Sequence, residues 1–319
     1  MVENKTIFIS ILKYNNQLTV GPKSILVTGG KGNDGCQTSG RVEILSNEVS
    51  LTNKTFEETP KHNNAFPLLI VHDGILLLCG GYSNQHRCLK YENGWKEHSI
   101  LNQHRTFSSA VTTANGTFIF GGGPGCIGQS FEFLPKKSNM WELGSTNIPV
   151  EFDGGCAVLV PEMNAILLIG GWQTEKRVLK FEIGTRDFKA MNVTLLNQRK
   201  NQECARLPDT NVIVITGGGV DDDNVLDTTE VFNLEDNTIT LGSPMNTKRW
   251  KHGMAVITVD DEDRLAIFGG RDENGDYLDS VEILNPRSRK WEVKSDLKLK
   301  EPKEEFGYIS LTNDFISNL

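Results

Sequence analysis

The chain has 319 residues, a formal net charge of −8 at pH 7 and a pI near 5.4. A protein that binds a nucleic-acid backbone needs a clustered basic face, so this acidic balance excludes nucleic acid as the expected partner. No run of about eighteen apolar residues is present, and residues 1–12 lack the basic start and cleavage site of a secretory leader. We therefore expect a cytoplasmic protein that does not contact a membrane.

One pattern repeats along nearly the whole chain, and its clearest copy runs from Leu265 to Trp291. An apolar, β-branched run ends in Gly-Gly, a polar loop follows, and a second run leads to an aromatic anchor. Such runs between turn residues predict strands rather than helices. The glycine pair recurs every 40 to 52 residues or so, a period typical of four-stranded propeller blades. The pairs are Gly29-Gly30, Gly80-Gly81, Gly121-Gly122, Gly170-Gly171, Gly217-Gly218 and Gly269-Gly270.

The repeats predict six blades, near residues 20–60, 66–98, 108–143, 155–191, 203–241 and 253–294. The last strand of blade one is expected near Phe56. After blade six, residues 305–312 have the pattern of an inner strand with no blade behind it. Because an open sheet edge invites aggregation, we expect this segment to close the ring within blade one. The apolar patch at residues 7–12 is its competitor for that place.

In the strands after each glycine pair, two further residue types recur at equivalent positions of the repeat. A glutamate occupies the third strand at Glu43, Glu132, Glu230 and Glu282, whereas Lys90 and Lys180 stand in the other two copies. A fourth-strand tryptophan appears at Trp95, Trp141 and Trp291. With these recurring residues the chain resembles the kelch-repeat β-propellers. The resemblance implies an all-β, six-bladed propeller of four-stranded antiparallel blades that forms a single domain over residues 1–319.

The cysteines and acidic runs give no sign of a metal or cofactor. The six cysteines contain no Cys-x-x-Cys spacing, so neither a zinc ribbon nor a redox pair is predicted, and we expect them to be reduced. The runs at 221–223 and 260–263 lack the alternating oxygen ligands of a calcium loop. They predict solvated turns on opposite faces of the disc.

Four Asn-x-Thr sequons occur, at Asn4, Asn53, Asn115 and Asn192. Such sequons accept N-linked glycans in secreted proteins. Secretion, with a leader removed, is therefore the alternative to a cytoplasmic location.

The candidate binding surface is a ring of charged residues. Six positions before Ala157, Ala205 and Ala255 of the inner strands stand Glu151, Arg199 and Arg249, and we align His62, His104 and Lys303 with them. Equivalent loop positions of a propeller surround its pore. Neighbouring loops add Arg105, Trp250, His252, Arg271, Trp172 and Tyr82. Because exposed arginine and aromatic side chains form interaction hot spots, this ring is predicted to contact a partner.

The resemblance and the ring together predict a protein-interaction module that binds an acidic or extended peptide through one propeller face. Many kelch propellers recognise substrates for ubiquitin ligases and others are cytoskeletal scaffolds. Since no BTB or BACK segment stands ahead of the repeats, such a role would require either a partner in trans or a longer protein of which this chain is a fragment.

The alternative is a kelch-type enzyme or lectin, similar to the sialate epimerases, that acts on a small anionic or sugar ligand over the pore. An enzyme is the less expected class, and no residue is assigned to catalysis. A deep pocket with converging Arg, His and Glu side chains would favour the small ligand. A broad, shallow basin would favour the peptide.

Overall fold

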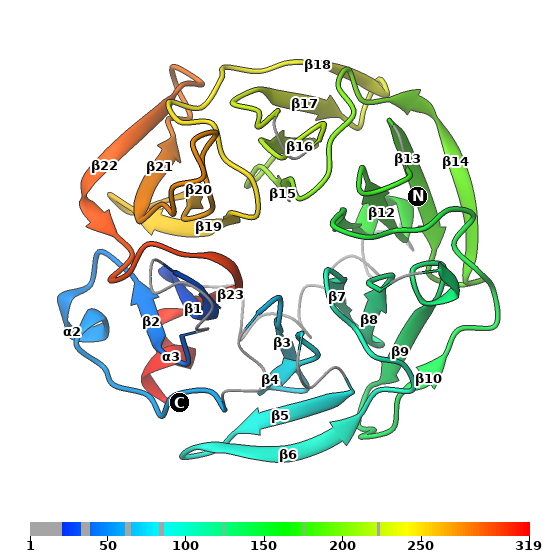
Figure 1. Cartoon of the computed structure of the whole chain (residues 1–319), viewed down its shortest axis with the longest axis horizontal. Helices are drawn as coiled ribbons and strands as arrows, with labels where there is room; N and C mark the ends of the chain where they lie inside the picture. Colours follow the sequence, from blue (N-terminus) through cyan, green and yellow to red (C-terminus); the bar gives the residue numbers. More distant parts are fainter. Residues whose placement is uncertain are drawn as a thin grey trace, which may run out of the picture.

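The computed structural model describes residues 21–32, 39–60, 65–82, 86–123, 125–174, 176–221 and 224–319. Within them the chain forms five four-stranded antiparallel sheets and one three-stranded sheet. The sheets surround a central opening as the blades of a propeller (Figure 1). The predicted all-β, six-bladed fold is therefore confirmed. Among these residues, no helix has the length and apolar character needed to cross a membrane.

Blades two to six each run from an inner to an outer strand in chain order. Blade two contains β3 (Leu68–His72), β4 (Ile75–Cys79), β5 (Arg87–Tyr91) and β6 (Trp95–Ile100). Blade three contains β7 (Ser109–Thr113), β8 (Gly116–Phe120), β9 (Phe131–Pro135) and β10 (Glu142–Leu143), with the short 3₁₀ helix η2 (Gly125–Ile127) between β8 and β9. Blade four contains β11 (Cys156–Val160), β12 (Ala165–Ile169), β13 (Arg177–Glu182) and β14 (Asp187–Thr194), with η3 (Pro161–Met163) after β11.

Blade five contains β15 (Glu203–Arg206), β16 (Val212–Thr216), β17 (Thr229–Asn233) and β18 (Thr238–Leu241). Blade six contains β19 (Gly253–Val259), β20 (Glu262–Phe268), β21 (Ser280–Leu284) and β22 (Trp291–Lys298). The acidic turn at Asp260 and Asp261 joins β19 to β20, whereas Asp221 lies in the loop between β16 and β17. These loops leave opposite ends of the second strands, so the two acidic segments lie on opposite faces as predicted.

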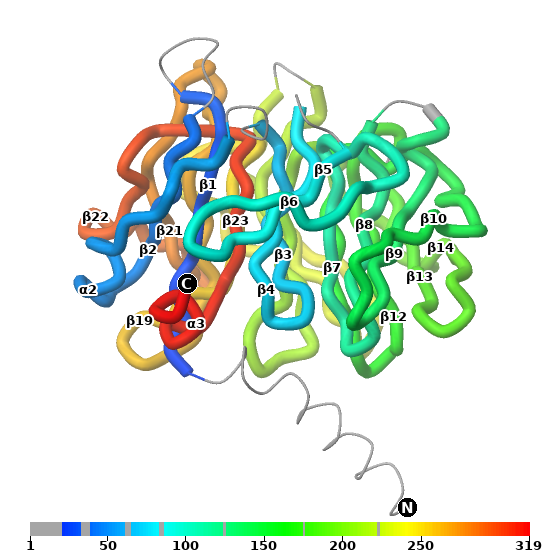
Figure 2. Tube along the Cα trace, turned by 90° about the horizontal axis from the view of Figure 1, so that it is seen from below, coloured from blue at the N-terminus to red at the C-terminus, as the bar shows by residue number. Residues whose placement is uncertain are grey.

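Both ends of the chain meet in blade one. Its strands are β1 (Lys23–Lys31), β2 (Val42–Leu45) and the C-terminal β23 (Glu304–Thr312), which pairs antiparallel with β1 as the inner strand. The C-terminal strand therefore closes the ring, as predicted; its proposed competitor, residues 7–12, lies outside the described residues. The short helix α3 (Asn313–Ser317) follows β23 at the face opposite the glycine turns (Figure 2).

The outer side of blade one differs from the prediction. Helix α2 (Val49–Thr52) and an irregular stretch stand where a fourth strand was expected near Phe56. The Phe56 ring instead packs edge-on against Tyr91 of blade two, with ring centroids 5.6 Å apart. Phe56 thus packs between blades one and two instead of extending the sheet of blade one as a hydrogen-bonded strand.

The glycine pairs connect neighbouring blades, which explains why they repeat. Gly270 has φ +92°, and a Cβ atom there would lie 2.7 Å from the Trp250 carbonyl oxygen. Its N–H donates to the Lys303 carbonyl of the next segment at 2.8 Å. A side chain would therefore be strained by both backbone conformation and close approach, and the structural role predicted for the pairs fits this geometry.

The tryptophan anchors also connect blades. The Trp141 indole N–H of blade three donates to the Ser99 hydroxyl of blade two at 3.1 Å. In blade six, the Trp291 indole N–H donates to Thr229 of blade five at 3.2 Å. Both rings are buried, so each one fills the space between two sheets while satisfying its polar atom.

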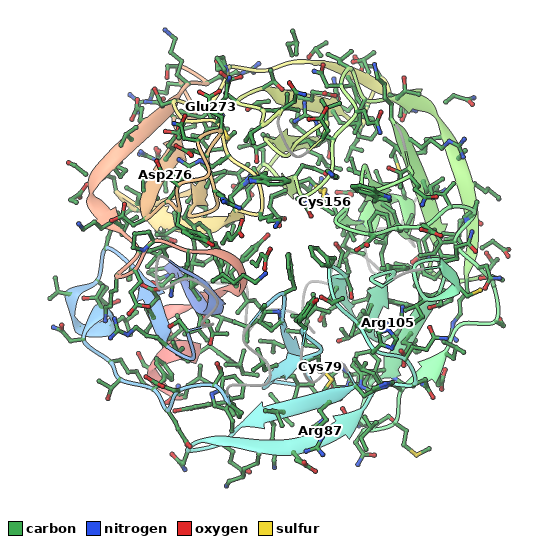
Figure 3. The ribbon with its side chains drawn as sticks, viewed as in Figure 1. Cys79, Arg87, Arg105, Cys156, Glu273 and Asp276 are labelled. Atoms are coloured by element: carbon green, nitrogen blue, oxygen red, sulfur yellow. A yellow bond between two sulfur atoms is a disulfide. The ribbon has the colours of Figure 1, made fainter. Side chains whose placement is uncertain are left out.

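Four cysteines form two disulfides, which corrects the prediction that the cysteines are reduced. Cys79 and Cys88 are directly opposite each other on β4 and β5. Cys156 and Cys204 join the inner strands of blades four and five, and Cys156 lies toward the central opening (Figure 3). Cys126 is free and exposed, and Cys36 lies outside the described residues. The spacing argument failed because antiparallel pairing and blade packing, not closeness in sequence, bring these sulfurs together.

Removal of residues 301–319 should prevent cooperative folding, because it takes away the inner strand of blade one and exposes the edge of β1. Circular dichroism and thermal melting of the truncated chain would measure this loss. A synthetic peptide of residues 301–319, added in trans, should restore part of the transition. A soluble truncated chain with an unchanged melting curve would contradict the role of β23.

Candidate functional site

The predicted charged ring is buried rather than exposed. The side chains of Arg199, Arg249 and Lys303 are at most 1% exposed, and each forms an ion pair with the third-strand glutamate of its own blade. Arg105, a neighbour in the predicted ring, does the same in blade three and lies inside it (Figure 3). We call these contacts the blade ion pairs: Arg105–Glu132, Arg199–Glu230, Arg249–Glu282 and Lys303–Glu43. The predicted exposure of these cations is therefore wrong.

Each blade ion pair fixes the segment that enters the blade. The Glu282 carboxylate accepts a hydrogen bond from an Arg249 Nη2 group at 2.8 Å and from the backbone N–H groups of Asn246 and Thr247 at 2.7 and 3.2 Å. Arg249 Nη1 donates to the carbonyl of Gly269, the first glycine of the pair. Linker, third strand and glycine turn thus share one buried charged network, in which both Glu282 oxygens accept hydrogen bonds.

The buried network also shows an error in the predicted alignment. In five of the six pairs the second glycine donates to a linker carbonyl: Gly81 to Arg105, Gly122 to Phe152, Gly171 to Arg199, Gly218 to Arg249 and Gly270 to Lys303. Arg105 and Phe152, rather than His104 and Glu151, are therefore the equivalents of Arg199 and Arg249. The predicted register is off by one residue in blades three and four. In blade four the cause is the reference alanine: Ala157 is the second residue of its inner strand, whereas Ala205 and Ala255 are the third residues of theirs.

Blade four replaces the ion pair with an apolar contact. Phe152 stands at the arginine position, and the residue opposite Leu168 is Leu179, not Lys180. Phe152 and Leu179 are buried in one cluster. Pro149, three residues before Phe152, has no N–H to offer a carboxylate. Cation, carboxylate and amide donor are thus all replaced together. Blade two likewise has Leu89 at the glutamate position, opposite Leu78.

The residues that surround the pore share one backbone conformation, and in four blades they lie two positions after the buried cation. They have φ between 50° and 60° and form the mouth ring: Phe66, Phe107, Gly154, Asn201, Lys251 and Glu305. Backbone hydrogen bonds join neighbours around most of this ring. Gly154 N–H donates to Phe107, Asn201 to Gly154, Lys251 to Asn201, Glu305 to Lys251 and Phe66 to Glu305. The left-handed conformation turns each linker into its inner strand and places one residue per blade at the pore; Gly154 alone among the six has no side chain to present there.

The side chains of the mouth ring divide it into an apolar and a charged side. The Phe66 and Phe107 rings pack with centroids 3.5 Å apart. On the other side Lys251 Nζ lies 2.5 Å from a Glu305 carboxylate oxygen, and Lys31 Nζ lies 2.6 Å from the second oxygen. The mouth ring opens into a channel of about 410 Å³ that the inner strands line.

A second hollow of about 240 Å³ lies beside the ring, lined by Asp153, Trp172, Lys200 and Trp250 together with ring residues. Lys200 Nζ lies 3.9 Å from the centre of the Trp172 ring, and Lys251 Nζ lies 4.8 Å from that of Trp250. Burial, aided by the nearby Glu151 carboxylate, raises the pKa of Asp153 to about 7. We call Tyr82, Trp172, Lys200, Trp250 and Arg271 around the mouth ring the mouth surface.

A family model for the Kelch motif matches residues 263–298, which cover most of blade six. The match falls on the copy with the clearest repeat, and the other five blades share its glycine turns. The chain is a kelch-repeat β-propeller. A comparison with curated proteins found no match.

The other predicted site residues of this kelch propeller differ in how exposed their side chains are. Trp172 and Tyr82 are 50% and 61% exposed, whereas Trp250 and His252 are buried. His104, Glu151 and Arg271 are partly buried, and His62 lies outside the described residues. His252 Nε2 lies 2.9 Å from the Thr216 hydroxyl. Burial, with the nearby arginines, holds the pKa of His252 well below its usual range. His252 is thus a neutral core residue.

Inside the channel of the kelch propeller, Glu203 of β15 forms a hydrogen bond with Tyr308 of β23. Burial is the main cause that raises the pKa of Glu203 to about 8. Burial and the neighbouring Glu203 raise the pKa of Tyr308 well above its usual value. Sequence reasoning missed this pair, whose members are far apart in the chain. The described residues contain no group of three or more His, Cys, Asp or Glu side chains that could hold a metal ion.

Replacement of Arg249 by Met should lower the free energy of unfolding by about 3 to 5 kcal/mol, because it leaves the Glu282 carboxylate buried without its cation. Arg249→Lys should lower the free energy of unfolding by less, since a lysine, Lys303, pairs with the third-strand glutamate in blade one. The double variant Arg249→Phe with Glu282→Leu, which copies the apolar pair of blade four, should recover part of the loss. Denaturant unfolding measures all three, and a strictly additive double variant would contradict the pairing.

Replacement of Glu203 by Gln should change how stability depends on pH. The folded state holds the Glu203 proton with a pKa of about 8, against an ordinary 4.5. The unfolded chain releases that proton first, so the free energy of unfolding falls as pH rises between these values. Glu203→Gln should therefore gain stability relative to the wild type from about pH 5 to about pH 8. Asp153 titrates in the same way in both proteins, so its contribution cancels from the difference between the two stability profiles. Parallel pH profiles in urea unfolding would contradict this.

Proposed function

We propose that this kelch propeller is a protein-interaction module whose mouth surface binds an extended, acidic segment of a partner. Kelch propellers commonly serve as interaction modules, and the loops of one face here combine aromatic rings with cations. The observation that supports this most directly is the exposed Trp172 ring with Lys200 Nζ 3.9 Å from its centre. An indole supplies contact area at little entropic cost, and the cation–π contact with the buried Lys200 stabilises the position of the ring.

The charges of the mouth surface favour an acidic partner. Lys31, Lys200, Lys251 and Arg271 stand around four carboxyl groups, those of Glu151, Asp153, Glu304 and Glu305. One of the four, Asp153, has its pKa raised to about 7 and is only partly ionised at neutral pH. Cations and carboxylates at the mouth are therefore close to balanced, on a chain of net charge −8. An acidic segment is thus repelled less at the mouth than by the acidic chain as a whole.

The alternative of a small anionic or sugar ligand is less well supported. That function would require arginine, histidine and glutamate side chains that converge in the pore. Arg105, Arg199 and Arg249 instead point into the blades, and His252 bonds to Thr216. The charged group that remains at the ring, Lys251 with Glu305, is already an ion pair. The exposed Trp172 and Tyr82 rings beside the mouth ring therefore favour a peptide over a small ligand.

Replacement of Trp172 by Ala should weaken peptide binding at least tenfold, equivalent to about 1.4 kcal/mol, because it removes exposed contact area and the platform for Lys200. The probe is a displayed library of random peptides selected on the wild-type protein, followed by titration of the recovered peptides. Arg271→Gln should mainly reduce the association rate and its dependence on salt.

Two controls separate the mouth surface from the rest of the molecule. Leu241→Ala removes an exposed apolar side chain from the outer strand β18, and Asp261→Ala changes the opposite face. Neither change should alter affinity, and all variants should melt as the wild type does. Equal weakening by either control, or unchanged affinity of Trp172→Ala, would show that the peptides bind elsewhere.

A further inference from the structure

The arrangement of the cysteines points to an oxidising compartment. Four of the five cysteines in the described ranges are joined in disulfides, and only Cys126 is free. Cys79 and Cys88 are fully buried, and Cys156 and Cys204 are at most 8% exposed. Cytosolic thiols are kept reduced, whereas disulfides form and persist in secreted and cell-surface proteins. Proteins that form disulfides in the secretory pathway also meet the enzymes of N-glycosylation there. The two disulfides are therefore an observation, independent of the sequons, that favours their use.

The three sequons within the described residues present exposed asparagines. Asn53 is the C-cap residue of α2, Asn115 lies in the turn between β7 and β8, and Asn192 lies on the outer strand β14. All three side chains are exposed, and no described hydrogen bond ties up a side-chain amide of theirs. We propose that Asn53, Asn115 and Asn192 carry N-linked glycans and that the protein matures in the secretory pathway.

The modification is a group transfer with a defined balance. The Nδ2 atom of asparagine bonds to the anomeric carbon of an oligosaccharide, while the bond from that carbon to the diphosphate of a lipid carrier breaks. The amide nitrogen loses one proton, and the lipid diphosphate leaves. A cellular transferase supplies the catalyst and the lipid-linked saccharide supplies the donor. The chain contributes an acceptor amide with a threonine two residues later, at Thr55, Thr117 and Thr194.

The positions of the three asparagines leave the mouth surface uncovered. Asn115 lies at the end of β7 that is farther from the mouth ring, because β7 begins just after Phe107 and ends at Thr113. Asn53 follows α2, which Figure 2 shows near the same end of the molecule as α3. Asn192 lies on the outermost strand of blade four, away from the pore (Figure 1). Glycans at these sites would shield the outer surface and the opposite face only.

The test uses the full protein purified from its natural source. Treatment with peptide N-glycosidase in heavy-oxygen water converts each glycosylated asparagine into a labelled aspartate that peptide mass spectrometry identifies. We expect the label at Asn53, Asn115 and Asn192, and disulfide-linked Cys79–Cys88 and Cys156–Cys204 peptides without reductant. Unlabelled asparagines would overturn the proposal, whether or not the disulfides are found.

Matched variants test each site in animal cells that secrete the chain. Thr194→Ala should remove one glycan and increase gel mobility by one step, whereas Thr194→Ser should keep it. Asn274→Gln changes an exposed asparagine outside any sequon and should leave mobility unchanged. Equal mobility of Thr194→Ala and the wild type would overturn the assignment of Asn192. Trp172→Ala should keep every glycan, so loss of peptide binding and loss of modification are separate outcomes.

Discussion

The buried pairing of a linker cation with a third-strand glutamate is the contact on which the rest of the ring depends. Each of the four ion pairs holds the entering linker against its own blade, and the next residues of that linker form the pore. The cation's own carbonyl accepts the N–H of a glycine in the preceding blade. One residue therefore joins two blades and sets where the mouth ring begins. A charged pair is effective here because its carboxylate can hold backbone N–H groups as well.

Much of the fold could be predicted because its signals are local. The glycine turns, the alternating strands and the tryptophan anchors each occupy a few neighbouring residues, and their repetition removes the ambiguity of a single copy. The inner-strand pattern around Phe306, which has no blade behind it, is local in the same way and therefore predicted ring closure. Helix α2 could not be predicted, since blade one has no tryptophan near Phe56 to mark an outer strand. An aromatic contact with blade two replaces that strand.

The site could be predicted only in outline, because burial of a charge depends on a partner far along the chain. Arg249 and Glu282 are 33 residues apart, and each alone resembles a solvated loop residue. The repeated linker cations and the repeated third-strand glutamates are both visible in the sequence. Neither set alone indicates that its side chains contact the other set. The exposed aromatics Trp172 and Tyr82 were predicted correctly as surface residues. The mouth ring itself was missed, since its six residues are of unrelated types and share only a backbone conformation.

The two blades that lack the glutamate are the blades that carry the disulfides. Leu89 and Leu179 stand at the glutamate positions of blades two and four. Blade two contains Cys79–Cys88, and Cys156–Cys204 ties blade four to blade five. A disulfide limits the freedom of the unfolded chain, whereas an ion pair stabilises the folded blade directly. Both therefore raise the free energy of unfolding, one through the unfolded state and the other through the folded state. The mouth ring does not follow this division, because blade three keeps its ion pair and still places Phe107 beside Phe66 of blade two. The device that stabilises a blade therefore does not dictate which residue that blade presents at the pore.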